Sequence, residues 1–356
     1  MNGSEPLRGA GAPRNRKGMT APLRLRLDSA ALVSNWRHLA KLSGTAACGA
    51  AIKANGYGLG SRGVAGRLAE AGCRDFFVAT WSEAEALADL GLTVSVLHGL
   101  RAEDPLDAPY ARPVLSTAEQ VARWKPTGRP CDVMVDTGMN RLGVSAREID
   151  SGLLDGLVIE TLMSHLVSAD EDVPLNGRQL AAFGALRGHT QAKRMSLANS
   201  AGIALGADYH FDLTRPGIAL YGGWQRSGHE AIRQVATPQA QILQRRFVRA
   251  GESVGYNAAW TAPADTEVAI LNLGYADGYL RCFTGKGLAM AEGVTLPLIG
   301  RVSMDLTAID VTALPALREG DWVTMSYALP ETAALSGLSQ YELLTGLGTR
   351  YDRIWD

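Results

Sequence analysis

Short apolar segments alternate with amphipathic helical segments through the first two thirds of this 356-residue chain. The apolar segments predict buried parallel strands at 48–52, 76–79, 94–97, 114–115, 132–135, 158–163, near 195 and at 218–220. Helices are expected between them, including 82–90, 116–125 and 179–186. About eight strands alternating with helices favour a parallel (β/α)8 barrel, with an open doubly wound sheet as the alternative. No Gly-x-Gly-x-x-Gly follows an early strand, so a dinucleotide-binding fold has little support.

The pattern changes after about Pro238, where short strands are separated by Gly and Pro and helical periodicity becomes sparse. We therefore predict an α/β chain with a TIM-type barrel over residues 22–237 and a mostly-β domain over 238–356. Residues 1–21 are rich in Gly, Pro, Arg and Lys and lack the apolar stretch of a secretory signal. They are expected to form a disordered lead-in.

The overall composition excludes several classes of partner. The formal net charge is -1, so nothing suggests binding to nucleic acid or to an acidic membrane surface. No run of eighteen apolar residues could span a membrane. The four cysteines lack Cys-x-x-Cys spacing, which indicates buried free thiols in a reducing compartment, and hence a cytoplasmic protein. Asp277 and Asp305 show no metal-ligand spacing, and no metal site is expected.

Lys53 directly follows the first predicted strand and opens the segment 53–60, in which three of the last five residues are glycine. Glycines let the backbone turn sharply and approach a ligand closely. An amine at this place could form a Schiff base with an aldehyde cofactor. The alternative is a strand-end lysine that points into solvent, and the segment alone favours neither.

Polar groups also follow later predicted strands. Segment 136–143 follows the fifth strand, Ser164-His165 the sixth and 199–202 the seventh, while Arg215 lies at the eighth. The carboxyl ends of barrel strands meet at one mouth, so these groups are expected to converge there with Lys53. A phosphate site built from the seventh and eighth loops is common in such barrels.

The segment Lys53-Ala54-Asn55-Gly56-Tyr57-Gly58 resembles the cofactor-lysine motif of the alanine racemases, which use pyridoxal phosphate (PLP) on a barrel of this kind. Eight further segments resemble motifs of the same family, in the expected order. They are 136–143, 164–165, 199–200, 215–222, 255–256, 274–278, 300–305 and 341–342. Together the nine segments extend the resemblance over nearly the whole chain from about residue 22 to 353.

The resemblance implies roles for three residues in particular. Lys53 is similar to the lysine that holds PLP and then acts as a base on one face of the substrate Cα. Tyr256 is similar to the second base, which acts on the opposite face from the partner subunit and so implies a homodimer with shared sites. Arg215 resembles the arginine that faces the pyridine nitrogen. Because arginine keeps its proton, it leaves that nitrogen unprotonated and limits side reactions.

The resemblance further implies a set of cofactor and substrate contacts. Arg141 is similar to the residue near the PLP phenolic oxygen and the substrate carboxylate, and His165 to the histidine near the ring. Met304 resembles a backbone contact to the substrate from the other subunit. The implied phosphate-binding set is Tyr57, Ser200, the backbone at Gly217 and Ile218, and Tyr341.

Three residues depart from the family pattern. Met134 stands where many members carry a lysine that becomes carbamylated and braces the arginine, so Arg141 is expected to be braced by another group, by a bound anion or by nothing. Leu59 and Ser196 stand where histidines are frequent. All three positions concern supporting groups and leave the lysine and the tyrosine intact.

The resemblance implies an alanine racemase that interconverts L- and D-alanine by two-base proton transfer on PLP. It would supply D-alanine for peptidoglycan or act in D-alanine catabolism. A racemase of broader or serine-type specificity is the first alternative. A PLP decarboxylase of the same fold type is disfavoured by Arg215 and Tyr256. A PLP-binding protein without catalysis is disfavoured by the expected β domain.

Overall fold

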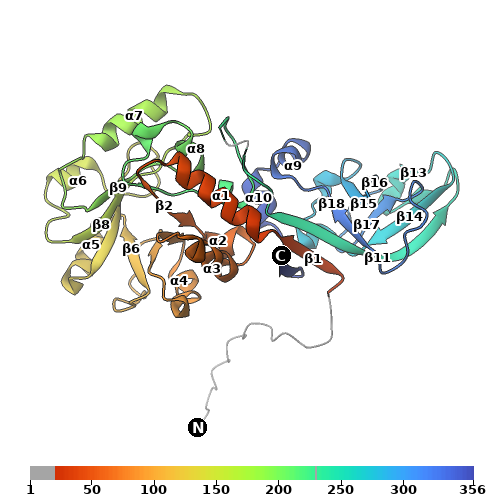
Figure 1. Ribbon diagram of the computed structural model, residues 1–356, viewed down its shortest axis with the longest axis horizontal. Coiled ribbons are helices and arrows are strands. Elements are labelled where there is room, and N and C mark those ends of the chain that lie inside the picture. The colour runs from red at the N-terminus through yellow and green to blue at the C-terminus, as the bar shows by residue number, and fades with distance from the viewer. Residues whose placement is uncertain (1–20, 229–230) are drawn as a thin grey trace, which may run out of the picture.

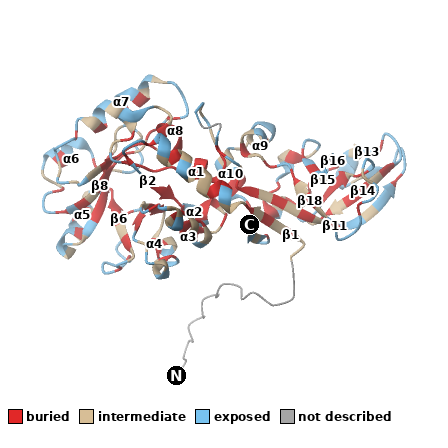
Figure 2. Cartoon of the chain, viewed as in Figure 1, coloured by how far each residue is buried: buried red, intermediate tan, exposed pale blue. Residues whose placement is uncertain are grey.

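The structure, a computed structural model, describes residues 21–228 and 231–356. The predicted lead-in therefore falls, except for Ala21, outside the described residues. Figure 1 shows two lobes, a barrel surrounded by helices and an elongated part made mostly of strands, with α1 and α10 near their junction. Buried residues follow the strands of both lobes, while the outer helices expose one face (Figure 2).

The barrel lobe is built from parallel strands that pair in chain order. Seven of them, in the described part of the chain, are β3 (Ala50–Ala51), β4 (Phe76–Val78), β5 (Val94–Val96), β6 (Ala111–Leu115), β7 (Pro130–Met134), β8 (Val158–Met163) and β9 (Arg194–Ser196). The strand β2 (Ala47–Cys48) precedes β3 and pairs in parallel with β10 (Leu213–Thr214). Backbone bonds from Asp212 to Met195 (3.0 Å) and from Arg215 to Ala198 (2.8 Å) join β10 to the β9 side. The barrel is therefore closed, which excludes the open sheet.

Helices cover the outside of the barrel. They are α1 (Ser29–Leu42), α3 (Ser61–Ala71), α4 (Trp81–Glu85), α5 (Ala118–Trp124), α6 (Ala146–Asp150), α7 (Pro174–Gly184) and α8 (Ser200–Ile203). Asp28 caps α1 by accepting a hydrogen bond from the Ala31 amide at 2.7 Å. The helix predicted over 82–90 was too long, because α4, capped by Thr80 paired with Glu83, ends at Glu85 and Ala88–Leu90 forms a separate 3-10 helix.

The predicted eighth strand at 218–220 was also wrong. The eighth strand is β10, and Ile218–Tyr221 forms a short 3-10 helix whose residues are all buried. A short buried apolar run has the same pattern in a strand and in a helix, so periodicity alone does not separate the two. The correction leaves Arg215 directly after the last strand.

The second lobe is a small antiparallel barrel. Its strands are β11 (Ala236–Val248), β14 (Thr266–Leu271), β15 (Leu288–Ala291), β16 (Val294–Ile299), β17 (Thr307–Asp310) and β18 (Trp322–Met325). The order β14-β17-β16-β15-β18-β11 closes because β11 also pairs with β14. The hairpin β12 (Ser253–Val254) and β13 (Trp260–Thr261) and the helices α9 (Leu329–Ser336) and α10 (Gln340–Thr345) complete this lobe.

Both ends of the described chain lie in the sheet of this second lobe. The strand β1 (Leu23–Leu27) pairs antiparallel with β11 and parallel with β19 (Asp352–Trp355). One core cluster of buried residues runs through both lobes, from Val96 of the barrel to Leu25 and Leu296 of the sheet. No helix in the described residues is long and apolar enough to cross a membrane.

Candidate active site

The lysine at the end of β3 is displayed by an unusual turn. After Lys53, five residues in succession have positive φ, namely Ala54 (52°), Asn55 (54°), Gly56 (64°), Tyr57 (54°) and Gly58 (86°). This left-handed turn, α2 (Lys53–Tyr57), costs roughly 1–2 kcal/mol for each non-glycine residue. The Asn55 side chain offsets part of that cost by accepting a hydrogen bond from the Ser61 amide at 3.0 Å.

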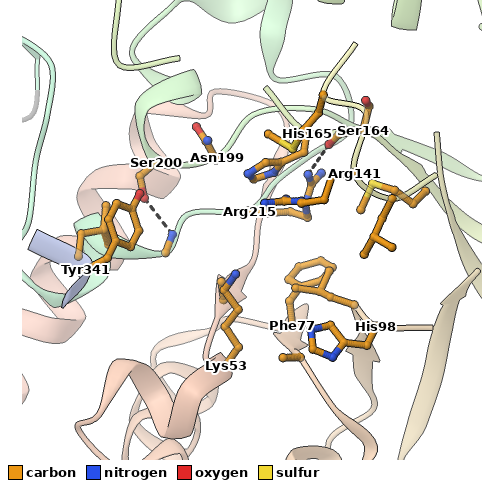
Figure 3. A pocket seen from close by; sticks show the side chains of 18 of the residues that line it. Lys53, Phe77, His98, Arg141, Ser164, His165, Asn199, Ser200, Arg215 and Tyr341 are labelled. Carbon is orange, nitrogen blue, oxygen red and sulfur yellow. Dashed lines mark hydrogen bonds between the residues drawn. The ribbon is translucent and has the colours of Figure 1, made fainter. Parts of the chain in front are cut away.

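A cavity of about 440 Å³ lies at the carboxyl ends of the barrel strands (Figure 3). Nine of the residues singled out in the sequence line it: Lys53, Tyr57, Arg141, His165, Ser200, Arg215, Gly217, Ile218 and Tyr341. Tyr256 and Met304 do not line it. They lie in the second lobe with 67% and 54% of their surface exposed, so a single chain does not bring them to Lys53.

The Arg215 guanidinium is buried and is held in one orientation by two hydrogen bonds. Its Nη2 donates to the Ser164 carbonyl at 2.5 Å, and its Nη1 donates to Ser196 Oγ. Burial lowers the pKa of Arg215 to about 10, while the Asp132 carboxylate opposes that shift. The guanidinium thus stays charged at neutral pH, and Ser196 fills the supporting place where the family often has a histidine.

Burial and neighbouring cations lower the pKa values of Lys53 and His165 in the cavity. Burial lowers the pKa of the Lys53 amine, Arg141 lowers it further, and the Glu83 carboxylate opposes both. Burial, followed by the charges of Arg215, Arg141 and Lys53, lowers the pKa of His165 to about 3. At neutral pH His165 is therefore uncharged, and Lys53 gives up its proton more readily than a free lysine.

Backbone amides and hydroxyls form a cradle on the opposite side of the cavity from His98 and Phe77 (Figure 3). The amides of Gly217 and Ala219 donate to Ser200 Oγ at 2.9 and 3.3 Å. A Cβ atom at Gly217 would lie 2.2 Å from Tyr57 Oη, so only glycine leaves room there. Because Ser200 Oγ accepts both amides, its hydroxyl hydrogen remains to donate to a phosphate oxygen. With Lys53 and Arg215 lining the same cavity, these residues fit PLP.

Arg141 has no protein brace. It is exposed at the cavity and makes no hydrogen bond or ion pair with another residue in the described ranges. Met134 lines the same cavity and offers only a thioether. The nearby Asp136 carboxylate instead accepts hydrogen bonds from the amides of its own loop, 138–140, at 2.9 to 3.1 Å.

Several lining residues were not predicted from the sequence. Phe77, Leu97 and His98 reach the cavity from the ends of β4 and β5. The strand-end argument that found Lys53 would have found only His98, because Phe77 and Leu97 are apolar and Phe77 lies within β4. Asp277 and Asp305 are instead both bound by Arg350 at 2.6 Å, in keeping with a structural role. No group of His, Cys, Asp and Glu that could hold a metal occurs in the part of the chain described.

Comparisons with known proteins agree with this geometry. The family models for the alanine racemase N-terminal and C-terminal domains match residues 27–225 and 235–355. An alanine racemase of Methylobacterium nodulans is 44% identical, covering 93% of this chain and 95% of its own. A biosynthetic and a catabolic alanine racemase of Agrobacterium fabrum are 39% and 40% identical, over 94% and 92% of this chain and 93% and 91% of theirs.

Solved structures give the same result. The alanine racemase of Bartonella henselae, which contains covalently bound pyridoxal phosphate, superposes with a TM-score of 0.86 at 33% identity, covering 95% of this chain and all (100%) of its own. The biosynthetic alanine racemase of Pseudomonas aeruginosa superposes with a TM-score of 0.83 at 30% identity and the same coverage, 95% and 100%. On its sequence, its two lobes and its cavity, this chain belongs to the alanine racemase family.

Proposed function

We propose that this protein interconverts L- and D-alanine with pyridoxal phosphate, using Lys53 of one subunit and Tyr256 of a second copy as the two bases. The observation that carries the proposal is the convergence of Lys53, Arg215 and the Ser200–Gly217 cradle on one cavity. Family membership supports the reaction type, and the cavity residues support the individual roles.

The charged residues of the cavity and His165 have different roles in the proposed reaction. Bound PLP supplies an electron-withdrawing ring that acidifies the α-proton of the amino acid. The Lys53 amine, with its lowered pKa, takes or returns that proton on the face it approaches. Arg215, which keeps its charge, would face the ring nitrogen of bound PLP, and His165, which is uncharged, would lie near the ring without adding another charge.

The remaining contacts bind rather than transfer protons. Tyr57, Ser200, Tyr341 and the backbone at Gly217 and Ile218 are proposed to hold the phosphate. The Arg141 guanidinium, which is free of protein partners in the described ranges, is proposed to bind the PLP phenolic oxygen and the substrate carboxylate.

The second base comes from another copy of the chain. Tyr256 lies on the second lobe between β12 and β13, outside the cavity of its own chain and largely exposed. The exposed Phe247 and Leu306 line the same hollow as Tyr256. Exposed apolar side chains gathered around one functional group favour a protein interface. A homodimer in which each second lobe covers the partner's cavity would bring Tyr256 and Met304 to the substrate.

We further propose that the enzyme acts in the cytoplasm. All four cysteines, which lie in the described residues, are unpaired, and three of them are buried. A reducing compartment keeps such thiols free. The similarity to a biosynthetic and a catabolic relative is nearly equal, so D-alanine supply and D-alanine breakdown are both compatible with this chain.

The reaction is tested by proton NMR of L-alanine with the PLP-loaded protein in D2O and a chiral readout of the product. Loss of the α-proton signal together with the appearance of D-alanine is expected. Repeating the assay with L-serine and L-lysine measures substrate breadth. An amine product lacking the carboxylate would instead identify a decarboxylase, and no exchange by folded, PLP-loaded protein would overturn the proposed function.

Sharing of sites is tested by mixing two inactive variants, K53A and Y256F. If each site uses Lys53 of one subunit and Tyr256 of the other, a mixed dimer contains one intact site and one doubly altered site. Statistical exchange of subunits should then restore roughly one quarter of the wild-type activity. If both residues came from the same subunit, mixing would restore no activity.

A further inference from the structure

Two groups of the site depend on the short segment that follows β8. The Ser164 carbonyl accepts a hydrogen bond from Arg215, and the His165 ring lines the cavity. Strand β8 ends at Met163, and the Ser164 amide still donates to the Ser196 carbonyl of β9 at 3.0 Å. From His165 onward the backbone lacks the regular ladder of the barrel. Buried backbone groups need partners, and something other than a strand must supply them here.

Gln179 of α7 supplies those partners. Its side chain is completely buried (0% exposed) although it belongs to an outer helix. Its Oε1 accepts from the Val167 amide at 2.9 Å, and its Nε2 donates to the His165 carbonyl at 3.0 Å. An amide N–H only donates and a carbonyl only accepts, so these two bonds fix the orientation of the Gln179 amide. Its amide thus makes the two bonds that a neighbouring strand would make.

The same side chain reaches a second site loop. Nε2 also donates to Thr137 Oγ1 at 3.2 Å, and Thr137 follows β7 in the loop that carries Arg141. Since Thr137 Oγ1 accepts from Gln179, the hydroxyl hydrogen of Thr137 is free to donate to Ser164 Oγ, 2.7 Å away. Gln179 therefore connects the loops after β7 and β8. It bonds two neighbours of Ser164, namely His165, which is next in the chain, and Thr137, whose hydroxyl is within hydrogen-bond distance of Ser164 Oγ.

We propose that Gln179 is a positioning residue of the racemase, which fixes the Ser164 carbonyl and the His165 ring and through them directs Arg215 at the cofactor. The inference rests on the proposed function, because Arg215 and His165 act through PLP. Loss of the amide would leave a donor at Val167 and an acceptor at His165 unpaired, and the segment would shift to find other partners. The expected result is a cofactor held less tightly and in a less productive position.

The test compares Gln179→Met, which keeps the length but makes none of the three bonds, with Asn176→Leu as a matched control. Asn176 is 3% exposed on the same helix, and its Nδ2 donates to the Ser168 and Glu171 carbonyls at 3.0 and 2.8 Å, farther along the same loop. For both variants we would measure thermal stability, the Kd of the apoprotein for PLP, the absorption spectrum of bound PLP, kcat and KM.

Both variants are expected to lose stability, because each leaves two partly buried loop backbone groups without their side-chain partner. Q179M alone is expected to raise the Kd for PLP and lower kcat by roughly tenfold or more, since only it touches the segment that holds Arg215. N176L should stay within about twofold of wild type in both quantities. Equal Kd, spectrum and kcat for Q179M and wild type, after correction for stability, would show that Gln179 is structural only.

A second pair of variants keeps the inference testable if Q179M does not fold. Thr137→Val removes the link to Ser164, whereas Thr137→Ser preserves a hydroxyl. T137V should weaken PLP binding and T137S should recover most of the loss, and equal effects of the two would overturn the proposal. Failure of the proposed function and failure of the positioning role can be told apart. A wild-type protein that binds PLP but does not racemise alanine would refute the proposed function. The Kd for PLP of the variants, compared with that of wild type, would still decide whether Gln179 positions the site.

Discussion

Charge at single residues explains why the cavity suits an anionic ligand. The cavity lining contains three cations, Lys53, Arg141 and Arg215, and one carboxylate, Asp136. The Asp136 carboxylate already accepts hydrogen bonds from backbone amides of its own loop. None of the three cations has an ion pair within the described residues. A phosphate together with a substrate carboxylate would balance this excess, which is the charge that PLP and an amino acid carry.

His165 shows what burial beside these cations costs the folded protein. The pKa of His165 is lowered from the ordinary value of 6.5 to about 3. Below about pH 6.5 the unfolded state therefore binds a proton that the folded state does not bind. Stability must therefore fall as the pH falls through that window. We expect the free energy of unfolding to drop by about 2 kcal/mol between pH 7 and pH 5 on account of this residue.

Chemical denaturation of wild type and His165→Gln at both pH values measures this contribution. The glutamine variant cannot take up the proton, so its stability should change less over the same interval by about that amount. H189N, which removes an exposed histidine outside the cavity, controls for the loss of a histidine as such. Equal pH dependence in wild type and H165Q would show that His165 is not held uncharged.

At the scale of a single element, the left-handed turn α2 is the clearest source of strain. Ala54 adopts a φ of 52° and is exposed, so its methyl group adds strain without adding burial. Ala54→Gly should raise the free energy of unfolding by about 0.5–1 kcal/mol, because the relief of left-handed strain exceeds the entropy cost of glycine.

The matched control should change the free energy of unfolding in the opposite direction. Ala69 lies in the right-handed helix α3, where the same change to glycine should lower stability by about 1 kcal/mol. Denaturant unfolding of A54G and A69G measures both. A destabilised A54G would mean that the turn is not strained at this residue, and the Kd for PLP would show whether its rigidity serves the cofactor.

Elements whose local pattern is unambiguous could be predicted, and so could the site residues at their ends. Lys53 and His165 line the cavity as expected, because each comes directly after a predicted apolar strand. Arg215 also lines it, although the eighth strand that led to its prediction was placed wrongly at 218–220. The segment 218–221 was misread because a buried 3-10 helix shows the same apolar run as a strand.

Other features depend on pairings that no local pattern contains. The strand at Leu23–Leu27 reads as an alternating strand, yet its partners β11 and β19 lie more than 200 residues away in sequence. Gln179 reads as a solvent-facing residue of an amphipathic helix, because glutamine is usually exposed. Only the fold reveals that its amide replaces a strand partner.

Over the whole molecule, the second lobe supports the lysine turn of the first. Tyr341 reaches the cavity from α10, and a Cβ atom at Gly58, which ends the turn, would lie 2.6 Å from the Leu344 carbonyl of the same helix. Arg353 of β19 donates from Nε to the Gly58 carbonyl at 2.8 Å and from Nη2 to the Gly348 carbonyl at 3.0 Å. The end of the chain thus holds the residue that closes the cofactor-lysine turn.

Replacing Arg353 should therefore affect both stability and cofactor retention. Arg353→Met leaves the carbonyls of Gly58 and Gly348 without these donors, which should lower the free energy of unfolding by about 1–3 kcal/mol and speed the loss of PLP on dialysis. Arg26 of β1, whose exposed ion pair with Asp356 lies just beyond the end of β19, provides the control. Because exposed ion pairs contribute little, R26A should change stability by less than about 1 kcal/mol and retain PLP. If R353M lost stability but kept PLP as wild type does, the second lobe would stabilise the fold without supporting the lysine turn.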